Sequence, residues 1–132
     1  MRKTTAVLFV VGVTVMADAA TRTADFTQDT VDRPPTGFAF GHTAGVGRPG
    51  RWVVHMDGTN KVLAQLDADR TGARFPVAVL ADVRAADVDV SVRFRPISGR
   101  GDQAAGLVWR YQDQDNYYVV RANANENNVV LY

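Results

Sequence analysis

The chain of 132 residues contains no cysteine, which excludes disulfides, thiolate metal sites and lipid attachment through an N-terminal cysteine. It has a single glutamate, Glu126, and two histidines, His42 and His55. Glycoside hydrolysis usually needs two carboxyl groups that flank the scissile bond, and this glutamate has no second glutamate to pair with. No Ser-His-Asp or metal-ligand spacing can be built from the two histidines. The scarcity of these residue types argues against catalysis by this chain alone.

The chain also lacks an excess of either charge once the N-terminus is set aside. A signal peptide is predicted there by the basic pair Arg2-Lys3, the non-ionic run Ala6–Met16 and the Ala17-Asp18-Ala19 cleavage pattern. The run is too short to span a bilayer. We therefore expect residues 1–19 to be removed and the protein to be exported, periplasmic or extracellular, without membrane insertion after cleavage.

Cleavage changes the charge balance of the chain. The 15 Lys and Arg residues lose Arg2 and Lys3, and the 14 Asp and Glu residues lose Asp18, which leaves 13 of each sign. A formally neutral chain argues against electrostatic capture of nucleic acid or of an anionic membrane.

What the sequence does contain is a series of short segments with the period-two alternation of β-strands. The expected strands are Phe38–Gly41, Arg51–Met56, Lys61–Leu66, Phe75–Leu80, Val88–Phe94, Leu107–Tyr111, Tyr117–Asn123 and Asn127–Tyr132. Asp57-Gly58 is a turn signal that joins the second and third of these as a hairpin. No helix-period segment stands out after the N-terminus. We predict an all-β fold, with residues 20–37 as a lead-in and residues 38–132 as a β-sandwich domain.

The hairpin around Asp113–Asn116 is the central feature of the pattern. If these four turn-forming residues are the loop, Tyr111 lies opposite Tyr118 and Trp109 opposite Val120. The face expected to be core then holds Leu107, Trp109, Tyr111, Tyr118, Val120 and Ala122. The face expected to be wet holds Val108, Arg110, Gln112, Tyr117, Val119, Arg121 and Asn123.

The wet face supplies the candidate ligand-binding residues. These are Arg110, Tyr117, Arg121 and Asn123, extended by Arg93 and Arg95 on the neighbouring strand and by Glu126 just beyond. Guanidinium groups and amides suit the hydroxyls or a carboxylate of a sugar, and an aromatic ring can stack on a pyranose. Glu126 is either a counter-ion of Arg121 or a turn residue. The alternative is a solvated or covered sheet face with no ligand.

Three strings carry a family resemblance: DADRTGARFPVAVL, VDVSVRFRPISG and DQAAGLVWRYQDQDNYYVVRANANENNVVLY. They resemble a bacterial group of concanavalin A-like, laminin-G-like jelly-roll domains related to the 3-keto-disaccharide hydrolase domain family, over Phe38–Tyr132. The resemblance implies a jelly-roll β-sandwich that binds a carbohydrate or glycan. Alternatives are a glycoside or 3-keto-disaccharide hydrolase domain with catalytic residues mostly outside this chain, and a structural sandwich mediating protein contacts.

The resembling domains continue beyond Tyr132, so we expect a jelly roll truncated at the C-terminus. Its last strand, Asn127–Tyr132, should then present an unpaired edge through which another chain can pair. We expect no cofactor and no metal site. Two loops do offer the clustered oxygens that calcium favours, Asp67-x-Asp69-x-x-Gly72 and Asp113-x-Asp115-Asn116. Neither completes an EF-hand loop, and ordinary turns explain both better.

Overall fold

The computed structural model describes residues 21–132, so the predicted signal peptide lies outside the described residues. Seven strands form three small antiparallel sheets, which confirms the all-β class. The described part of the chain has no α-helix, only a 3-10 turn, η1, at Thr43–Gly45. No helix among residues 21–132 is long and apolar enough to cross a membrane.

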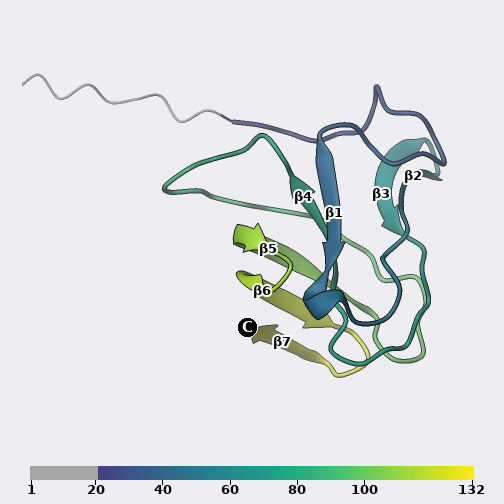
Figure 1. The fold of residues 1–132 in the computed structure, drawn as a ribbon. Coiled ribbons are helices and arrows are strands. Elements are labelled where there is room, and N and C mark those ends of the chain that lie inside the picture. The colour runs from purple at the N-terminus through teal and green to yellow at the C-terminus, as the bar shows by residue number, and fades with distance from the viewer. Residues whose placement is uncertain (1–20) are drawn as a thin grey trace, which may run out of the picture.

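The strands fall close to the segments expected from alternation. One sheet pairs β1 (Phe38–His42) with β4 (Pro76–Leu80), a second pairs β2 (Trp52–Asp57) with β3 (Asn60–Gln65), and the third orders β5 (Ala104–Asp113), β6 (Asn116–Asn123) and β7 (Asn128–Leu131). In the view of Figure 1 β1 runs between the β2–β3 hairpin on its right and the three-stranded sheet at its lower left.

The β2–β3 hairpin confirms the expected turn at Asp57-Gly58, where Gly58 adopts a φ of 62° that suits glycine. Val53 and Val54 of β2 are buried. The lead-in extends this sheet, because the Asp32 N–H donates to the Val54 carbonyl at 2.8 Å and the Val54 N–H to the Arg33 carbonyl at 2.8 Å. Part of the predicted lead-in therefore belongs to the fold.

A row of aromatic rings joins the lead-in to the first two sheets. Phe26 contacts Phe38 with ring centroids 5.9 Å apart, Phe38 contacts Phe40 at 6.5 Å, and Phe40 contacts Trp52 at 6.3 Å. Each ring contributes apolar burial where a chain this small has few fully buried side chains. Phe26, the only large apolar residue of the lead-in, anchors that segment to β1.

The β5–β6 hairpin keeps the predicted register only at its tip, where Asp113 lies opposite Asn116. Beyond an irregularity between Trp109 and Asp113, Trp109 lies opposite Tyr118 rather than Val120. Two extra residues of β5 are taken up there, and Arg110 adopts a φ of 51°. Because of this bulge, the predicted register is wrong by two positions from Trp109 back to the start of β5.

The predicted core face of this sheet is wrong. Val119 and Asn123, expected on the wet face, are buried, whereas Tyr118, expected in the core, is 51% exposed. The buried face of the sheet is the one that packs against the segment leading into β4. Phe75, just before β4, meets the Tyr132 ring at 5.7 Å. We call the face of β5–β7 that bears Val119 and Asn123 the inner face and the opposite one the outer face.

The expected strand Val88–Phe94 is not found as a strand. No residue between β4 and β5 belongs to a strand, and Val88–Phe94 is exposed throughout. In Figure 1 this stretch runs behind β1 after the turn that follows β4. Its residues alternate between apolar and polar in sequence, but no neighbouring strand within the described residues supplies the hydrogen bonds that would make it part of a sheet.

Candidate functional site

The structure brings three of the predicted site residues together and separates the others. Arg121, Asn123 and Glu126 form one polar cluster at the turn between β6 and β7. Arg121 Nη2 donates to Glu126 Oε2, and Arg121 Nη1 lies 3.6 Å from Asp102 Oδ1. Of the two roles considered for Glu126, the structure shows the counter-ion, placed within the turn.

Arg121 is held on the inner face with its side chain only 11% exposed. Its guanidinium carbon lies 5.6 Å from the centroid of the Tyr132 ring, within range of a cation–π contact. Within residues 21–132 no hydrogen-bond partner reaches its buried Nε. Because the charged end already faces Glu126 and Asp102, Arg121 stabilises the turn rather than offering an open guanidinium to a ligand.

Asn123 joins two loops and has little capacity left for a ligand. It is 2% exposed, and its Nδ2 donates to Asp102 Oδ1 at 2.6 Å. Its Oδ1 accepts from the Asn125 N–H at 3.0 Å and from the Gln103 N–H at 3.4 Å. A buried amide used on both ends fixes the position of its neighbours. Asn123 therefore shapes the β6–β7 turn.

Tyr117 lies at the other end of the hairpin. Its hydroxyl is 2.6 Å from Thr43 Oγ1, and its ring contacts Tyr111 at 5.5 Å. The Ala44 N–H donates to Asp115 Oδ1 at 2.9 Å, which ties η1 to the hairpin tip. Burial of the Tyr111 ring raises the pKa of its hydroxyl. These contacts dock the hairpin tip on η1.

Two predicted arginines are exposed and belong neither to the polar cluster at the β6–β7 turn nor to the contacts at the hairpin tip. Arg110 stands at the bulge of β5, and Arg93 lies on the unpaired stretch before β5. Arg95, also on that stretch, pairs with Asp57 at 2.6 Å. The predicted patch is therefore not one continuous surface.

An open hollow of about 360 Å³ lies beside the β6–β7 turn. It is lined by Phe94, Pro96, Ala122, Asn123, Ala124, Asn127, Asn128 and Val129. One wall comes from the unpaired stretch and the other from the asparagine-rich turn. Asn128 Nδ2 donates to Glu126 Oε2 at 3.2 Å, so the polar cluster at the β6–β7 turn also positions this wall. We call this feature the asparagine hollow.

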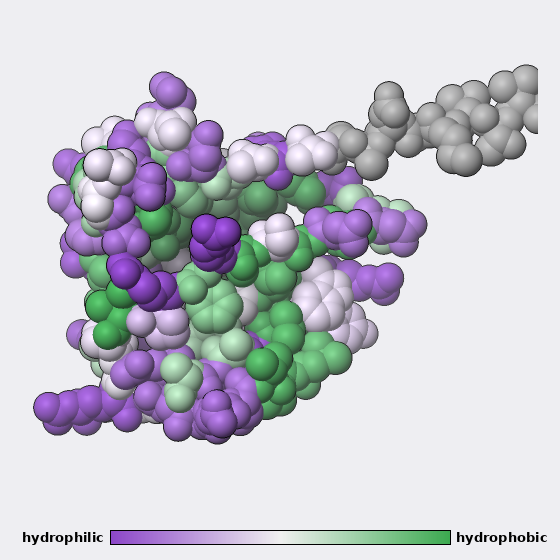
Figure 2. Space-filling view, turned by 180° about the vertical axis from the view of Figure 1, so that it is seen from behind, coloured by the Kyte–Doolittle hydropathy of each residue, from purple (hydrophilic) through white to green (hydrophobic). Residues whose placement is uncertain are grey.

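Apolar surface continues from the asparagine hollow along the outer face of the sheet. Figure 2 shows it gathered on the side of the molecule where the β5–β7 sheet lies. The exposed apolar side chains there include Tyr118, Val129 and Leu131 on the outer face and Phe94 across the hollow.

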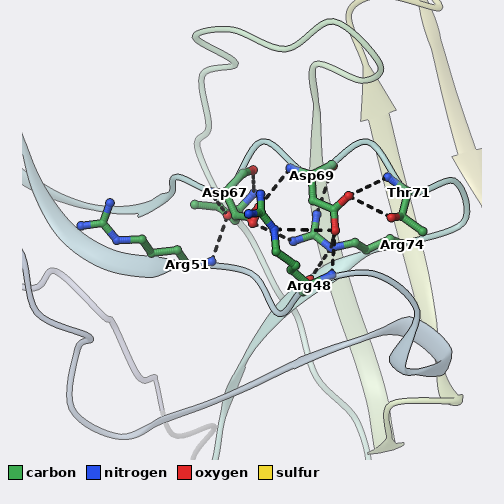
Figure 3. Close-up of polar contacts among 7 residues, drawn as sticks. Arg48, Arg51, Asp67, Asp69, Thr71 and Arg74 are labelled. Carbon is green, nitrogen blue, oxygen red and sulfur yellow. Dashed lines mark hydrogen bonds and ion pairs between the residues drawn. The ribbon is translucent and has the colours of Figure 1, made fainter.

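A second polar cluster, drawn in Figure 3, fixes the loop after β3. Arg74 is nearly buried, with its side chain 3% exposed, and its Nη2 lies 3.5 Å from Asp67 Oδ2. Arg48 Nη2 donates to Asp67 Oδ1 at 3.2 Å, and the Arg48 N–H donates to Asp69 Oδ2 at 2.6 Å. Thr71 Oγ1 donates to Asp69 Oδ1 at 2.8 Å. We call these five residues the arginine–aspartate cluster.

Hydrogen bonds keep Asp69 ionised. The N–H of Arg48, the Thr71 hydroxyl and the Thr71 N–H lower its pKa to about 2, in that order, against a smaller opposing effect of desolvation. Two carboxylates balanced by two guanidiniums leave no net negative charge for calcium. No three His, Asp or Glu side chains within residues 21–132 come together as a metal site.

The second calcium candidate is a capped turn. The Asp115 N–H donates to Asp113 Oδ1 at 2.8 Å, and Asn116 Nδ2 donates to the same oxygen at 2.8 Å. The N–H of Asp115, followed by the Asn116 side chain, lowers the pKa of Asp113. Hydrogen bonds of this kind are those of an Asx turn.

Residues 123–128 show what the sequence interpretation missed. The asparagine-rich stretch lies where two predicted strands meet, and Phe94 ends a third predicted strand, so the strand pattern alone does not bring them together. The density of asparagines was the available signal. Their meeting with Phe94, which lies 29 residues or more earlier in the chain, requires the fold.

Comparison of the chain with protein-family models, with curated proteins and with solved structures finds no match. The concanavalin A-like resemblance therefore stays a prediction.

Proposed function

We propose that this protein is an exported, non-catalytic domain that binds a carbohydrate or glycan in the asparagine hollow. The observation that carries the proposal is the hollow itself, about 360 Å³ in volume, with amides on one wall and Phe94 with Pro96 on the other. That volume falls within the range of small-molecule sites. Its open shape suits the end of a glycan better than a fully enclosed ligand.

The chemistry of the lining supports a sugar. Each amide offers both a donor and an acceptor, as the hydroxyls of a sugar do. The Asn127 and Asn128 side chains are exposed at the turn, whereas Asn123 is saturated and serves as support. The Phe94 ring presents an apolar surface to the C–H face of a pyranose. No formal charge lines the hollow, which fits a neutral ligand.

The proposal moves the centre of binding away from the predicted arginine patch. Arg121 and Glu126 stabilise the turn from the inner side, and Asn123 couples that turn to Asp102. Arg110, Tyr117 and Arg93 lie outside the hollow. In this proposal Arg121, Asn123 and Glu126 are positioning residues, and Asn127, Asn128 and Phe94 contact the ligand.

We further propose that the three sheets are part of a jelly-roll β-sandwich. Two features support this: every strand pair within the sheets is antiparallel, and β1 pairs with β4 across the intervening β2–β3 hairpin. Crossovers of this kind occur in Greek-key sandwiches. Hydrolase activity and a structural role stay predictions from the resemblance, because no geometric observation favours either one.

A glycan array tests the proposal. The purified chain is compared with Asn127→Ala/Asn128→Ala, which removes the two exposed amides of the hollow. The matched control is Gln114→Ala, an exposed amide at the opposite end of the β5–β6 hairpin. We expect the parent and the control to bind the same glycans, and the double variant to bind at least about tenfold more weakly.

A second variant, Phe94→Ala, removes the aromatic wall without touching the turn. It should weaken binding to the same glycans while the circular dichroism spectrum is unchanged. A well-folded parent that binds no glycan, or a double variant with the parent's binding profile, would refute the proposal.

A further inference from the structure

The stretch from Asp87 to Arg95 reads Asp-Val-Asp-Val-Ser-Val-Arg-Phe-Arg, and it is self-complementary about Ser91. Every second residue is apolar: Val88, Val90, Val92 and Phe94. The other positions carry two carboxylates before Ser91 and two guanidiniums after it. We call residues 87–95 the palindromic segment.

The structure leaves the palindromic segment without a strand partner. No backbone hydrogen bond within the described residues joins Val88–Phe94 to another strand. Its four apolar side chains, Val88, Val90, Val92 and Phe94, are 42–52% exposed. A segment with strand alternation, exposed apolar side chains and free N–H and C=O groups is a template for pairing with another chain.

Antiparallel pairing of this segment with a second copy of itself satisfies both faces. With Ser91 opposite Ser91, Asp89 lies opposite Arg93 of the second copy, and Asp87 lies opposite Arg95. On the other face Val88 lies opposite Phe94, and Val90 lies opposite Val92. Opposite charges directly across an antiparallel pair stabilise it, as do pairs of β-branched and aromatic residues.

We propose that two copies of this protein form a two-fold dimer by antiparallel pairing of their palindromic segments. The interface is isologous, so each residue meets the same set of partners in both copies and the assembly closes at two. The register is selected by charge, because a shift of two residues would place Asp87 opposite Arg93 but leave Asp89 opposite Ser91. Shifts further in that direction would align carboxylates with carboxylates.

The surroundings of the segment favour pairing with a second copy. Phe94 already lies across the asparagine hollow from Ala122 and Val129, so the apolar face of the paired ribbon would continue onto the outer face of β6 and β7. Arg95 is engaged with Asp57 in an exposed ion pair, 66% and 49% exposed. The Asp89–Arg93 pair is therefore the one that the dimer can form without giving up an existing contact.

The open edge of β7 is a weaker site for a second copy. Its residues Asn128–Leu131 carry no charge, so nothing in that strand selects a register or a partner. The palindromic segment differs in having charges that distinguish its two halves. Because this charge pattern is complementary to itself, it favours a second copy of the same chain as the partner.

Charge reversal tests the proposal in the full chain. Sedimentation equilibrium over a wide concentration range compares the parent with Asp89→Arg, Arg93→Asp and the double variant Asp89→Arg/Arg93→Asp. Each single change puts like charges opposite each other at two symmetric places, so we expect about tenfold weaker dimerisation or more. The double variant recreates both opposite-charge pairs and should restore the parent's dissociation constant. Asp82→Arg, outside the segment, is the matched control and should dimerise as the parent does.

Three results would overturn the proposal: a parent that stays monomeric into the millimolar range, single reversals that dimerise as the parent does, or a double variant no better than the singles. The last result would show that Asp89 and Arg93 do not meet across the interface. Because both side chains are exposed and make no side-chain hydrogen bond or ion pair within residues 21–132, the variants should fold, which circular dichroism verifies.

Discussion

β5 and the palindromic segment carry the same kind of alternation, yet only one of them is a strand. β5 alternates through Leu107 and Trp109 and pairs along most of its length with β6. The palindromic segment alternates through Val88, Val90 and Val92 and pairs with nothing in the described chain. Alternation therefore specifies two faces of a chain segment, and a hydrogen-bonding neighbour decides whether that segment joins a sheet.

The largest expected effect comes from breaking the paired member of this comparison. A Cβ on Gly106 would clash with the carbonyl oxygen of Val120 on β6. Gly106→Ala should therefore push β5 away from β6 and lower the free energy of unfolding by about 3 kcal/mol. Gly101→Ala is the matched control, because a Cβ there meets nothing within 4 Å. Urea unfolding at low protein concentration measures both.

The corresponding change in the palindromic segment should do little to the monomer. Val90→Ala removes methyl groups that are about half exposed, so the free energy of unfolding should change by less than about 0.5 kcal/mol. A loss at Val90 as large as that at Gly106 would show that the segment is part of a packed sheet, and the contrast between the two segments would be lost.

A smaller effect is expected from ion pairs, which differ between the loop after β3 and the exposed Asp57–Arg95 pair at the end of the palindromic segment. The arginine–aspartate cluster holds Asp69 with a pKa of about 2, below its ordinary value of 3.8. A depressed pKa stabilises the folded state fully above about pH 4, and this contribution is lost as the pH falls from 4 through 2. Asp69→Asn should lower stability at pH 7 and flatten the decline of stability between pH 4 and pH 2.

The control for this prediction is Asp57→Asn, in the exposed pair with Arg95. Exposed pairs contribute little, so this variant should follow the parent's pH profile closely. Urea unfolding midpoints at several pH values provide the measurement. An Asp69→Asn profile with the parent's slope would mean that Asp69 is not held by Arg48 and Thr71 in solution.

The strands were largely predictable because hydrophobic period and turn chemistry are local. The β2–β3 hairpin follows from Asp57-Gly58, and most strand bounds agree within about two residues of the alternating segments. The pairing of β1 with β4 was not predictable, since it joins residues more than 30 positions apart. It depends on packing between segments rather than on local pattern.

The faces of β5–β7 show a different limit. The two sets of residues were separated correctly apart from the bulge, but the inner and outer sets were exchanged. Apolar content favoured the face with Trp109 and Tyr118, whereas the structure buries Val119 beside two polar residues, Arg121 and Asn123. Those polar groups are tolerated inside because Asp102 and Glu126 pair with the Nη atoms of Arg121 and Asp102 accepts from the Asn123 amide. Such partners are invisible until the loops are placed.

The candidate site was predictable in part. The Arg121–Glu126 pair was weighed from sequence, since five residues across a tight turn can bring the two charges together. The asparagine hollow was not, because it forms where Phe94 crosses the β6–β7 turn. A site made by two distant segments needs the fold before its lining can be known.

Hydrogen–deuterium exchange at two protein concentrations tests most directly whether the palindromic segment is a strand without a partner in the single chain. We predict rapid exchange of the Val88–Phe94 amides in dilute solution and slower exchange at high concentration, with the β6 amides protected in both. Protection of Val88–Phe94 that is already complete in dilute solution would contradict the account, as would rapid exchange that persists at high concentration.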